Sequence, residues 1–266
     1  MRVGLFIPCY VDQVFPQVGI ATAWLLRRAG VDEIVFPERQ TCCGQPAFNT
    51  GYWFEARRVA ASWLDAFAGA EPLDAIVVPS GSCGAMVRVF FPELWHPSRE
   101  GEWTRHEREL APAAHRLAAK THELSQFLVD VLGVEDLGAA CPMRITYHDS
   151  CHHTRELRGR EAPRRLLKRV AGLQLIEMQE SDTCCGFGGT FAVKFEEISS
   201  AMAEQKVERI RASGAEAVVA ADVSCLMHLQ GWMKRHHVPV RVMHLAEVLA
   251  CGAPDLAAGG REEARP

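Results

Sequence analysis

Ten cysteines are present in this chain of 266 residues, and eight of them follow a repeated spacing. Within each group of four, the steps between cysteines are 33, 1 and 40 residues, and the second group lies 142 residues after the first. The first group is Cys9, Cys42, Cys43 and Cys83, and the second is Cys151, Cys184, Cys185 and Cys225. A long repeat without an insertion indicates a tandem duplication. We therefore expect two similar sites, each built from four thiols.

Three kinds of chemistry use groups of four thiols. Disulfides are disfavoured, because adjacent cysteines form only a strained ring and because a reducing compartment keeps thiols free. Zinc is compatible with four thiolates, but its sites commonly use Cys-x-x-Cys pairs, and this sequence has none. An iron–sulfur cluster, whose usual ligands are four thiolates, is the better match. We expect iron–sulfur clusters, with zinc as the alternative.

The two groups differ in the residues around them. Cys184 and Cys185 are followed by a glycine-rich segment, residues 186–189, where the first group has Gln45 and Pro46. Three histidines flank the first cysteine of the second group: His148, His152 and His153. Glycines let backbone N–H groups approach sulfur, and a histidine can donate to a cluster or carry a proton, although it serves local polar groups equally well. We predict a redox-active second site and a more structural first site, with zinc as an alternative occupant there.

Short apolar runs precede the cysteines and are typical of strands. In the first half they cover residues 3–7, 34–36 and 75–78, and helical spacing of apolar residues predicts helices over 18–29 and 54–67. Strands that alternate with helices favour a parallel sheet, and the loops that follow parallel strands meet at the carboxyl edge. The sequence therefore predicts an α/β fold of two tandem duplicated domains, each a small parallel sheet with flanking helices and its cysteines at the carboxyl edge.

The segment between the two groups is predicted to be helical. Thr104 and Glu107 form a capping-box signature, and apolar spacing predicts a further helix over residues 122–132. We expect a first domain over residues 1–140 that includes this helical connector, a second domain over 141–251, and a disordered tail over 252–266.

Composition and charge exclude several classes of protein. The chain is 48% hydrophobic and 23% charged, as in ordinary folded proteins. Its formal charge is −4 without a long basic block, so we expect no nucleic-acid partner. We expect no membrane span either, because every apolar run is too short. The first residues lack the apolar region of a secretory signal, which favours a cytoplasmic protein.

The cysteine pattern resembles a known family. Cys9, Cys42-Cys43-Gly44 and Ser80-x-x-Cys83 recur as Cys151, Cys184-Cys185-Gly186 and Asp222-x-x-Cys225. This pattern is similar to the duplicated cysteine-rich CCG domain family, which includes the cysteine-rich subunit of heterodisulfide reductase and the iron–sulfur subunit of glycolate oxidase. The resemblance extends from residue 1 to about residue 250, and it includes short free-standing members that take part in lactate utilisation.

That resemblance implies an iron–sulfur redox subunit of an L-lactate-oxidising complex, rather than a complete enzyme. It implies lactate-utilisation proteins B and C as partners, L-lactate as the substrate of the complex, and electron transfer during L-lactate degradation. The alternatives are a zinc-stabilised assembly scaffold and a catalytic subunit like that of heterodisulfide reductase. Ser80 and Asp222 stand where the fullest pattern of the family has a further cysteine. A [4Fe-4S] cluster held by four cysteines is therefore the simpler expectation.

Overall fold

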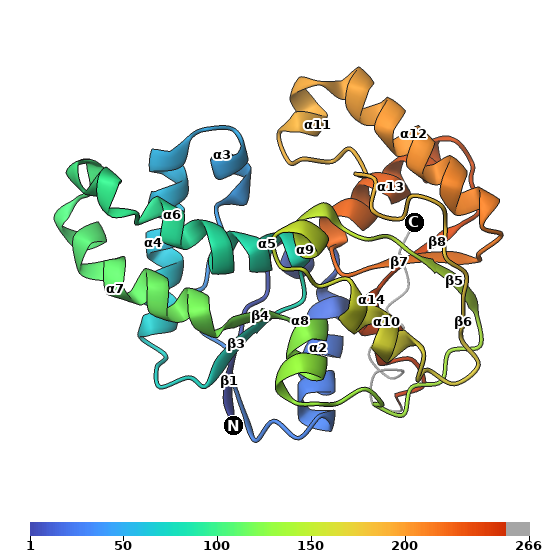
Figure 1. Cartoon of the computed structure of the whole chain (residues 1–266), viewed down its shortest axis with the longest axis horizontal. Coiled ribbons are helices and arrows are strands. Elements are labelled where there is room, and N and C mark those ends of the chain that lie inside the picture. The colour runs from blue at the N-terminus through green and yellow to red at the C-terminus, as the bar shows by residue number, and fades with distance from the viewer. Residues whose placement is uncertain (254–266) are drawn as a thin grey trace, which may run out of the picture.

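The computed structural model describes residues 1–253 and contains two four-stranded sheets with helices on both faces (Figure 1). Every strand pairing is parallel. The first sheet has the order β2-β1-β3-β4 and the second the order β6-β5-β7-β8. The strands are β1 (Arg2–Leu5), β2 (Glu33–Val35), β3 (Ala75–Val78), β4 (Thr121–Glu123), β5 (Arg144–Tyr147), β6 (Gln174–Leu175), β7 (Ala217–Ala220) and β8 (Arg241–His244). The predicted α/β fold of two tandem units is confirmed.

The duplication is visible in the register of the sheets. Val3 pairs with Ala75 in the first sheet, and Ile145 pairs with Ala217 in the second, so both partners shift by the 142 residues that separate the cysteine groups.

The tail that the sequence predicts over residues 252–266 lies mostly outside the described residues.

Helices connect the strands in both halves. Those of the first half are α1 (Cys9–Val14), α2 (Pro16–Arg28), α3 (Gln45–Asn49), α4 (Trp53–Ala68), α5 (Gly81–Ala85), the π-helix η1 (Met86–Phe90), α6 (Phe91–Leu94), the 3-10 helix η2 (Pro97–Glu102), α7 (Arg105–Lys120), α8 (Leu124–Gln126) and the π-helix η3 (Phe127–Val131). Those of the second half are α9 (Cys151–Arg155), α10 (Glu161–Leu167), α11 (Phe191–Lys194), α12 (Glu196–Ala212), α13 (Val223–Arg235) and α14 (Leu245–Leu249). Within residues 1–253, none of these helices is long and apolar enough to cross a membrane.

Alternate residues of each strand pack into different cores, as the pleat of a sheet requires. Val77 of β3 and Val219 of β7 belong to one cluster that draws on both sheets and on α2, α8, α10 and α14; we call it the central core. Ile76 packs instead with α4, α6 and α7, and Val218 packs with α12 and α13. Each sheet thus has its own outer core, while the two sheets share the central core.

The fourth strand of the first sheet differs from the sequence prediction. Residues 121–123 form β4 beside β3, so the predicted helix over 122–132 begins two residues later, at Leu124. Thr121 and Glu123 are buried in β4, and Glu123 also caps α8 by accepting from the Ser125 N–H. A strand of three residues leaves too little pattern to detect, because its stability comes from the neighbouring strand.

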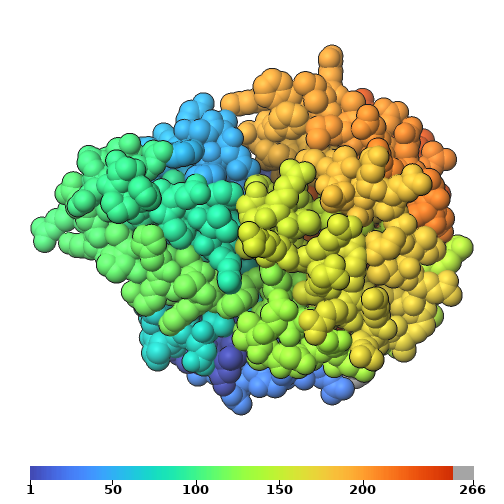
Figure 2. Space-filling model, in the orientation of Figure 1, coloured from blue at the N-terminus to red at the C-terminus, as the bar shows by residue number. Residues whose placement is uncertain are grey.

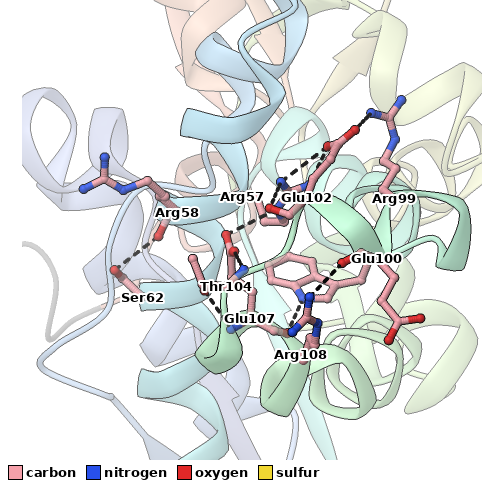
Figure 3. A network of polar contacts seen from close by, with 10 residues as sticks. Arg57, Arg58, Ser62, Arg99, Glu100, Glu102, Thr104, Glu107 and Arg108 are labelled. Atoms are coloured by element: carbon pink, nitrogen blue, oxygen red, sulfur yellow. Dashed lines mark hydrogen bonds and ion pairs between the residues drawn. The ribbon is translucent and has the colours of Figure 1, made fainter.

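A buried arginine stabilises the long segment that connects β3 to β4 in the first half. Ile76 pairs with Thr121 whereas Val218 pairs with Val242, so the segment from the third to the fourth strand is longer in the first half and contains α7. Arg57 of α4 is fully buried, and its guanidinium contacts Glu102 at 3.4 Å and Glu107 at 3.2 Å (Figure 3). The predicted capping box of α7 is confirmed.

The two halves meet directly beside the cysteine groups. Figures 1 and 2 show α5 of the first half against α9 of the second, with a continuous seam between the halves. The Gly81 N–H donates to the Ala221 carbonyl at 3.0 Å across this seam. A Cβ on Gly81 would lie 2.4 Å from Cβ of His153, so only glycine permits this approach. The hydroxyls of Thr50 in the first half and Thr190 in the second also lie 2.8 Å apart.

Candidate metal centres

The four cysteines of the first group lie together at the carboxyl ends of the strands. Cys9 begins α1 after β1, Cys42 and Cys43 precede α3 after β2, and Cys83 lies in α5 after β3. The Sγ atoms of Cys9 and Cys42 are 3.7 Å apart, and those of Cys43 and Cys83 are 3.3 Å apart. The predicted convergence of these four thiols is therefore observed. Cys9 and Cys42 are half-buried, which leaves one side of the group open.

The second group repeats this arrangement. The thiols of Cys151, Cys184, Cys185 and Cys225 lie near enough to shift one another's pKa values. All four line a narrow pocket of about 60 Å³. Residues of the first half complete the walls of this pocket: Gln45, Asn49 and Ser82. The second group therefore opens onto the seam between the halves, where neither half alone encloses it.

The glycine after each cysteine pair has a structural role. Gly44 and Gly186 have φ values of +82° and +91°, in the left-handed region that favours glycine. A Cβ on Gly186 would lie 2.6 Å from the Ser199 carbonyl oxygen. In this conformation each glycine N–H points at the sulfur two residues earlier, 3.4 Å from Sγ of Cys42 and of Cys184. The CCG motif thus aims a backbone donor at a sulfur in both halves.

Hydrogen bonds from neighbouring thiols favour the thiolate form of Cys42 in the first group, and of Cys184 and Cys225 in the second. The Cys43 and Cys9 thiols lower the pKa of Cys42 to about 3, and the same effect from Cys151 lowers the pKa of Cys184 to about 2. The pKa of Cys9 is raised, because its proton is held by the Cys42 sulfur and because the group is partly desolvated. Thiolate is the form that binds metal.

Ser80 and Asp222, at the places where the family pattern has a further cysteine, contact each other across the seam. The Ser80 Oγ lies 3.3 Å from Oδ2 of Asp222, and the Ser82 N–H donates to the same oxygen at 2.7 Å. The other carboxylate oxygen accepts from the Ser224 N–H at 3.1 Å. Both oxygens of Asp222 are therefore engaged in joining α5 to α13, which disfavours this residue as a metal ligand.

A network of charged side chains stabilises the loops around the second group of cysteines. The Arg164 guanidinium donates to both carboxylate oxygens of Asp149, at 2.7 and 2.9 Å, and the Ser181 hydroxyl donates to Asp149 at 2.7 Å. Lys206, fully buried, donates to the Ser181 carbonyl at 3.2 Å, and burial lowers the pKa of its ammonium group to about 8. The first half has the apolar Leu64 at the matching place.

The sequence analysis did not identify Arg164 or Lys206. A direct comparison of the two halves would have pointed to Lys206, because a lysine replaces leucine on the buried side of the helix.

The three histidines near Cys151 have different surroundings. His152 pairs with Glu156 at 3.2 Å, and the buried His153 pairs with Glu123 of the first half at 3.2 Å. His148 is fully buried, and neither of its ring nitrogens has a hydrogen-bond partner among the described residues. One ring nitrogen and the sulfurs of Cys185 and Cys225 lie within 4.8 Å of one another. Of the three, only His148 faces the thiols in this way.

These donor sets fit a thiolate-bound metal centre in each half. Sulfur is a soft donor, and buried thiolates need a cation to offset their loss of hydration. Two sulfurs on one tetrahedral ion with bonds of about 2.3 Å lie about 3.8 Å apart, close to the observed contacts of 3.3 and 3.7 Å. Ligands on different irons of a cluster lie further apart, so cluster binding requires the sulfurs to separate.

The fold and the two cysteine groups define a class of protein. The family model of the CCG cysteine-rich domain matches residues 3–88 and again residues 145–230. The chain therefore belongs to the CCG cysteine-rich domain family and contains two copies of its domain.

Curated relatives extend the similarity to nearly the whole chain. Lactate utilization protein A of Geobacillus thermodenitrificans is 48% identical over 249 residues, which is 94% of this chain and 98% of that protein. Lactate utilization protein A of Bacillus subtilis is 45% identical over 249 residues, or 94% of this chain and 99% of that protein. Among solved structures, glutamate racemase from Francisella tularensis matches 94% of this chain and 78% of its own, with a TM-score of 0.37 and 10% identity. That structural similarity is too low to support a conclusion about this protein.

Proposed function

We propose that this protein is an iron–sulfur redox subunit of an L-lactate-oxidising complex. One observation carries the proposal: eight thiols gather into two groups of four in a chain that matches proteins named Lactate utilization protein A over 94% of its length. In this proposal all eight cysteines are ligands, and each group binds one cluster of the [4Fe-4S] type. Lactate-utilisation proteins B and C are the partners, L-lactate is the substrate of the complex, and the reaction takes place in the cytoplasm.

The surroundings of the thiols support electron transfer. In each group two cysteines are buried and two are half-buried, so a centre held there is shielded from water on one side and lies near the surface on the other. Backbone N–H groups directed at sulfur are a known means of tuning the potential of a cluster. In this proposal the first domain comprises residues 1–140 and the second 141–251.

Metal analysis of the anaerobically purified full chain is the first test. We expect iron and acid-labile sulfide in similar amounts and a broad visible absorbance that dithionite bleaches. Cys184→Ser should lose part of the iron, while Cys141→Ser, a cysteine outside both groups, should keep all of it. Absence of iron and sulfide from the wild-type chain, even after anaerobic reconstitution, would refute the proposal.

Activity provides the second test. The chain alone should oxidise lactate slowly or not at all, and addition of the two partner proteins should restore turnover with an artificial electron acceptor. Rapid lactate oxidation by the isolated chain would show that it is a complete enzyme.

A zinc-stabilised scaffold is the second candidate, and the sulfur–sulfur contacts of 3.3 and 3.7 Å favour it. In that case the purified protein is colourless and contains zinc in a fixed ratio to the chain.

A further inference from the structure

His148 lies at the end of β5, at the position that Phe6 occupies at the end of β1. Both side chains are fully buried. Phe6 packs against the rings of Trp63 and Phe67, with centroid distances of 5.5 and 5.9 Å, and completes the outer core of the first half. The second half puts a polar ring in that place, and this ring lies beside the sulfurs of Cys185 and Cys225.

The hydrogen-bonding capacity of this imidazole is unfilled. A neutral imidazole has one N–H and one nitrogen lone pair, and a buried group of either kind needs a partner. Within residues 1–253 neither ring nitrogen has one. A hydrogen bond to a thiolate would satisfy the N–H alone and would leave the lone pair buried without a donor. A metal ion held by the adjacent sulfurs would accept that lone pair, and the N–H is then the one group of the ring that still needs a partner.

We propose that His148 is a direct nitrogen ligand of the metal centre in the second half, next to Cys185 and Cys225 and in place of one of the four thiolates. This inference deepens the proposed function and rests on it for the presence of a metal centre, whatever the metal. Three donor atoms within 4.8 Å of one another match the separations of ligands around one ion. A tetrahedral ion and a [4Fe-4S] cluster each offer four positions to the protein, so one of Cys151 and Cys184 takes the fourth position and the other thiol lies beside the centre.

The proposal makes the two centres chemically different. The first half has Phe6 where an imidazole would be needed, so its centre has sulfur ligands only. Replacing a thiolate-only environment by one with an imidazole changes the charge and the softness of the donor set. The second centre therefore differs from the first in its own ligands, as well as in the glycines and charged residues that surround it.

Pulsed EPR of the full-length protein labelled with ¹⁵N-histidine tests this assignment. The dithionite-reduced protein is used where the centre contains iron, and the Co²⁺-substituted protein where it contains zinc. We expect a strong nitrogen hyperfine coupling that changes with the ¹⁵N label. His148→Phe should lose this coupling, since it installs the residue of the first half. His228→Gln is the control, because that ring also lies near Cys184 but is already paired with the Ser199 hydroxyl at 3.3 Å.

The outcomes separate this inference from the proposed function. Iron and sulfide without a histidine coupling would overturn the ligand assignment and leave the redox proposal standing. Zinc without iron, together with a nitrogen coupling in the Co²⁺-substituted protein, would overturn the redox proposal and leave the ligand assignment standing. A coupling that persists in His148→Phe would also overturn the assignment, because another histidine would then be the ligand. If His148→Phe does not fold, the labelled wild-type protein still shows whether a directly bound nitrogen is present.

Discussion

Replacing His244 with asparagine should remove part of the acid sensitivity of the fold. His244 caps α14 by accepting from the Ala246 N–H at 3.1 Å, and its side chain is buried. Burial lowers the pKa of this imidazole from 6.5 to about 4, although the carboxylates of Glu123 and Asp222 act in the opposite direction. Protonation would remove the acceptor that caps the helix and would place a charge in the interior.

The size of the effect follows from the two pKa values. Between pH 6.5 and pH 4 the unfolded chain binds a proton at this position and the folded chain does not, so stability is lost as the pH falls through that window. Each pKa unit corresponds to about 1.4 kcal/mol, which gives a full contribution of about 3 kcal/mol. Roughly 1.4 kcal/mol of this is lost between pH 8 and pH 5.5.

Urea unfolding of the wild-type protein and of His244→Asn at pH 8 and pH 5.5 measures this contribution. Asparagine is a good N-cap residue without a titrating group, so the variant keeps an acceptor for the helix. Metal release and the other titrating groups affect both proteins alike and cancel in the comparison. The fall in unfolding free energy should be about 1.4 kcal/mol smaller in the variant. An equal fall in both proteins would refute the assignment of a neutral, buried His244.

Three further predictions concern the first half, the seam and the cysteines. Arg57→Ala should lower the unfolding free energy by about 3–5 kcal/mol, because it leaves the buried Glu107 carboxylate without its partner. Asp222→Ala should lower it by about 3 kcal/mol, because two backbone N–H groups and two hydroxyls lose their acceptor; thermal or urea unfolding measures both changes. Cys184→Ser should abolish lactate-dependent electron flow in the reconstituted complex, whereas Cys42→Ser should chiefly reduce the melting temperature and complex assembly.

Each of these predictions has a control or a contrary outcome, and an Asp222→Ala protein as stable as the wild type would contradict the role of this carboxylate in joining α5 to α13. Arg105→Ala disrupts an ion pair with Glu109 in which both side chains are exposed, and it should leave stability unchanged. A similar loss in Arg57→Ala and Arg105→Ala would contradict the role of burial. For the cysteines, a Cys42→Ser protein that folds and assembles normally but transfers no electrons would show that both centres are redox-active.

Local patterns predicted much of this fold. The apolar run over residues 75–78 is β3 at its full length, and the helix predicted over 54–67 is α4, which extends one residue further at each end. The convergence of the thiols followed from their places after strands, because parallel strands end at a common edge. These features depend on residues close in sequence or on a rule that holds for every parallel sheet.

Features that depend on contacts between the two halves could not be predicted in the same way. The sequence identified Ser80 and Asp222 as departures from the family pattern, yet only the structure places them 3.3 Å apart. His148 was one of three histidines with equal standing in the sequence, and burial beside two sulfurs distinguishes it from the others. β4 was missed because a three-residue strand is stabilised by its neighbour rather than by its own composition.

The central core has a consequence for how such a chain could arise. Its apolar residues come from both halves in comparable numbers, so one half alone would expose a broad apolar face to water. A single-copy ancestor with this core would have had to cover that face with an identical twin, as a two-fold dimer does. In such a dimer both cysteine groups necessarily have the same surroundings, since every mutation appears twice. Fusion of the two copies into one chain removes this constraint, and Phe6 beside one cysteine group can then coexist with His148 beside the other.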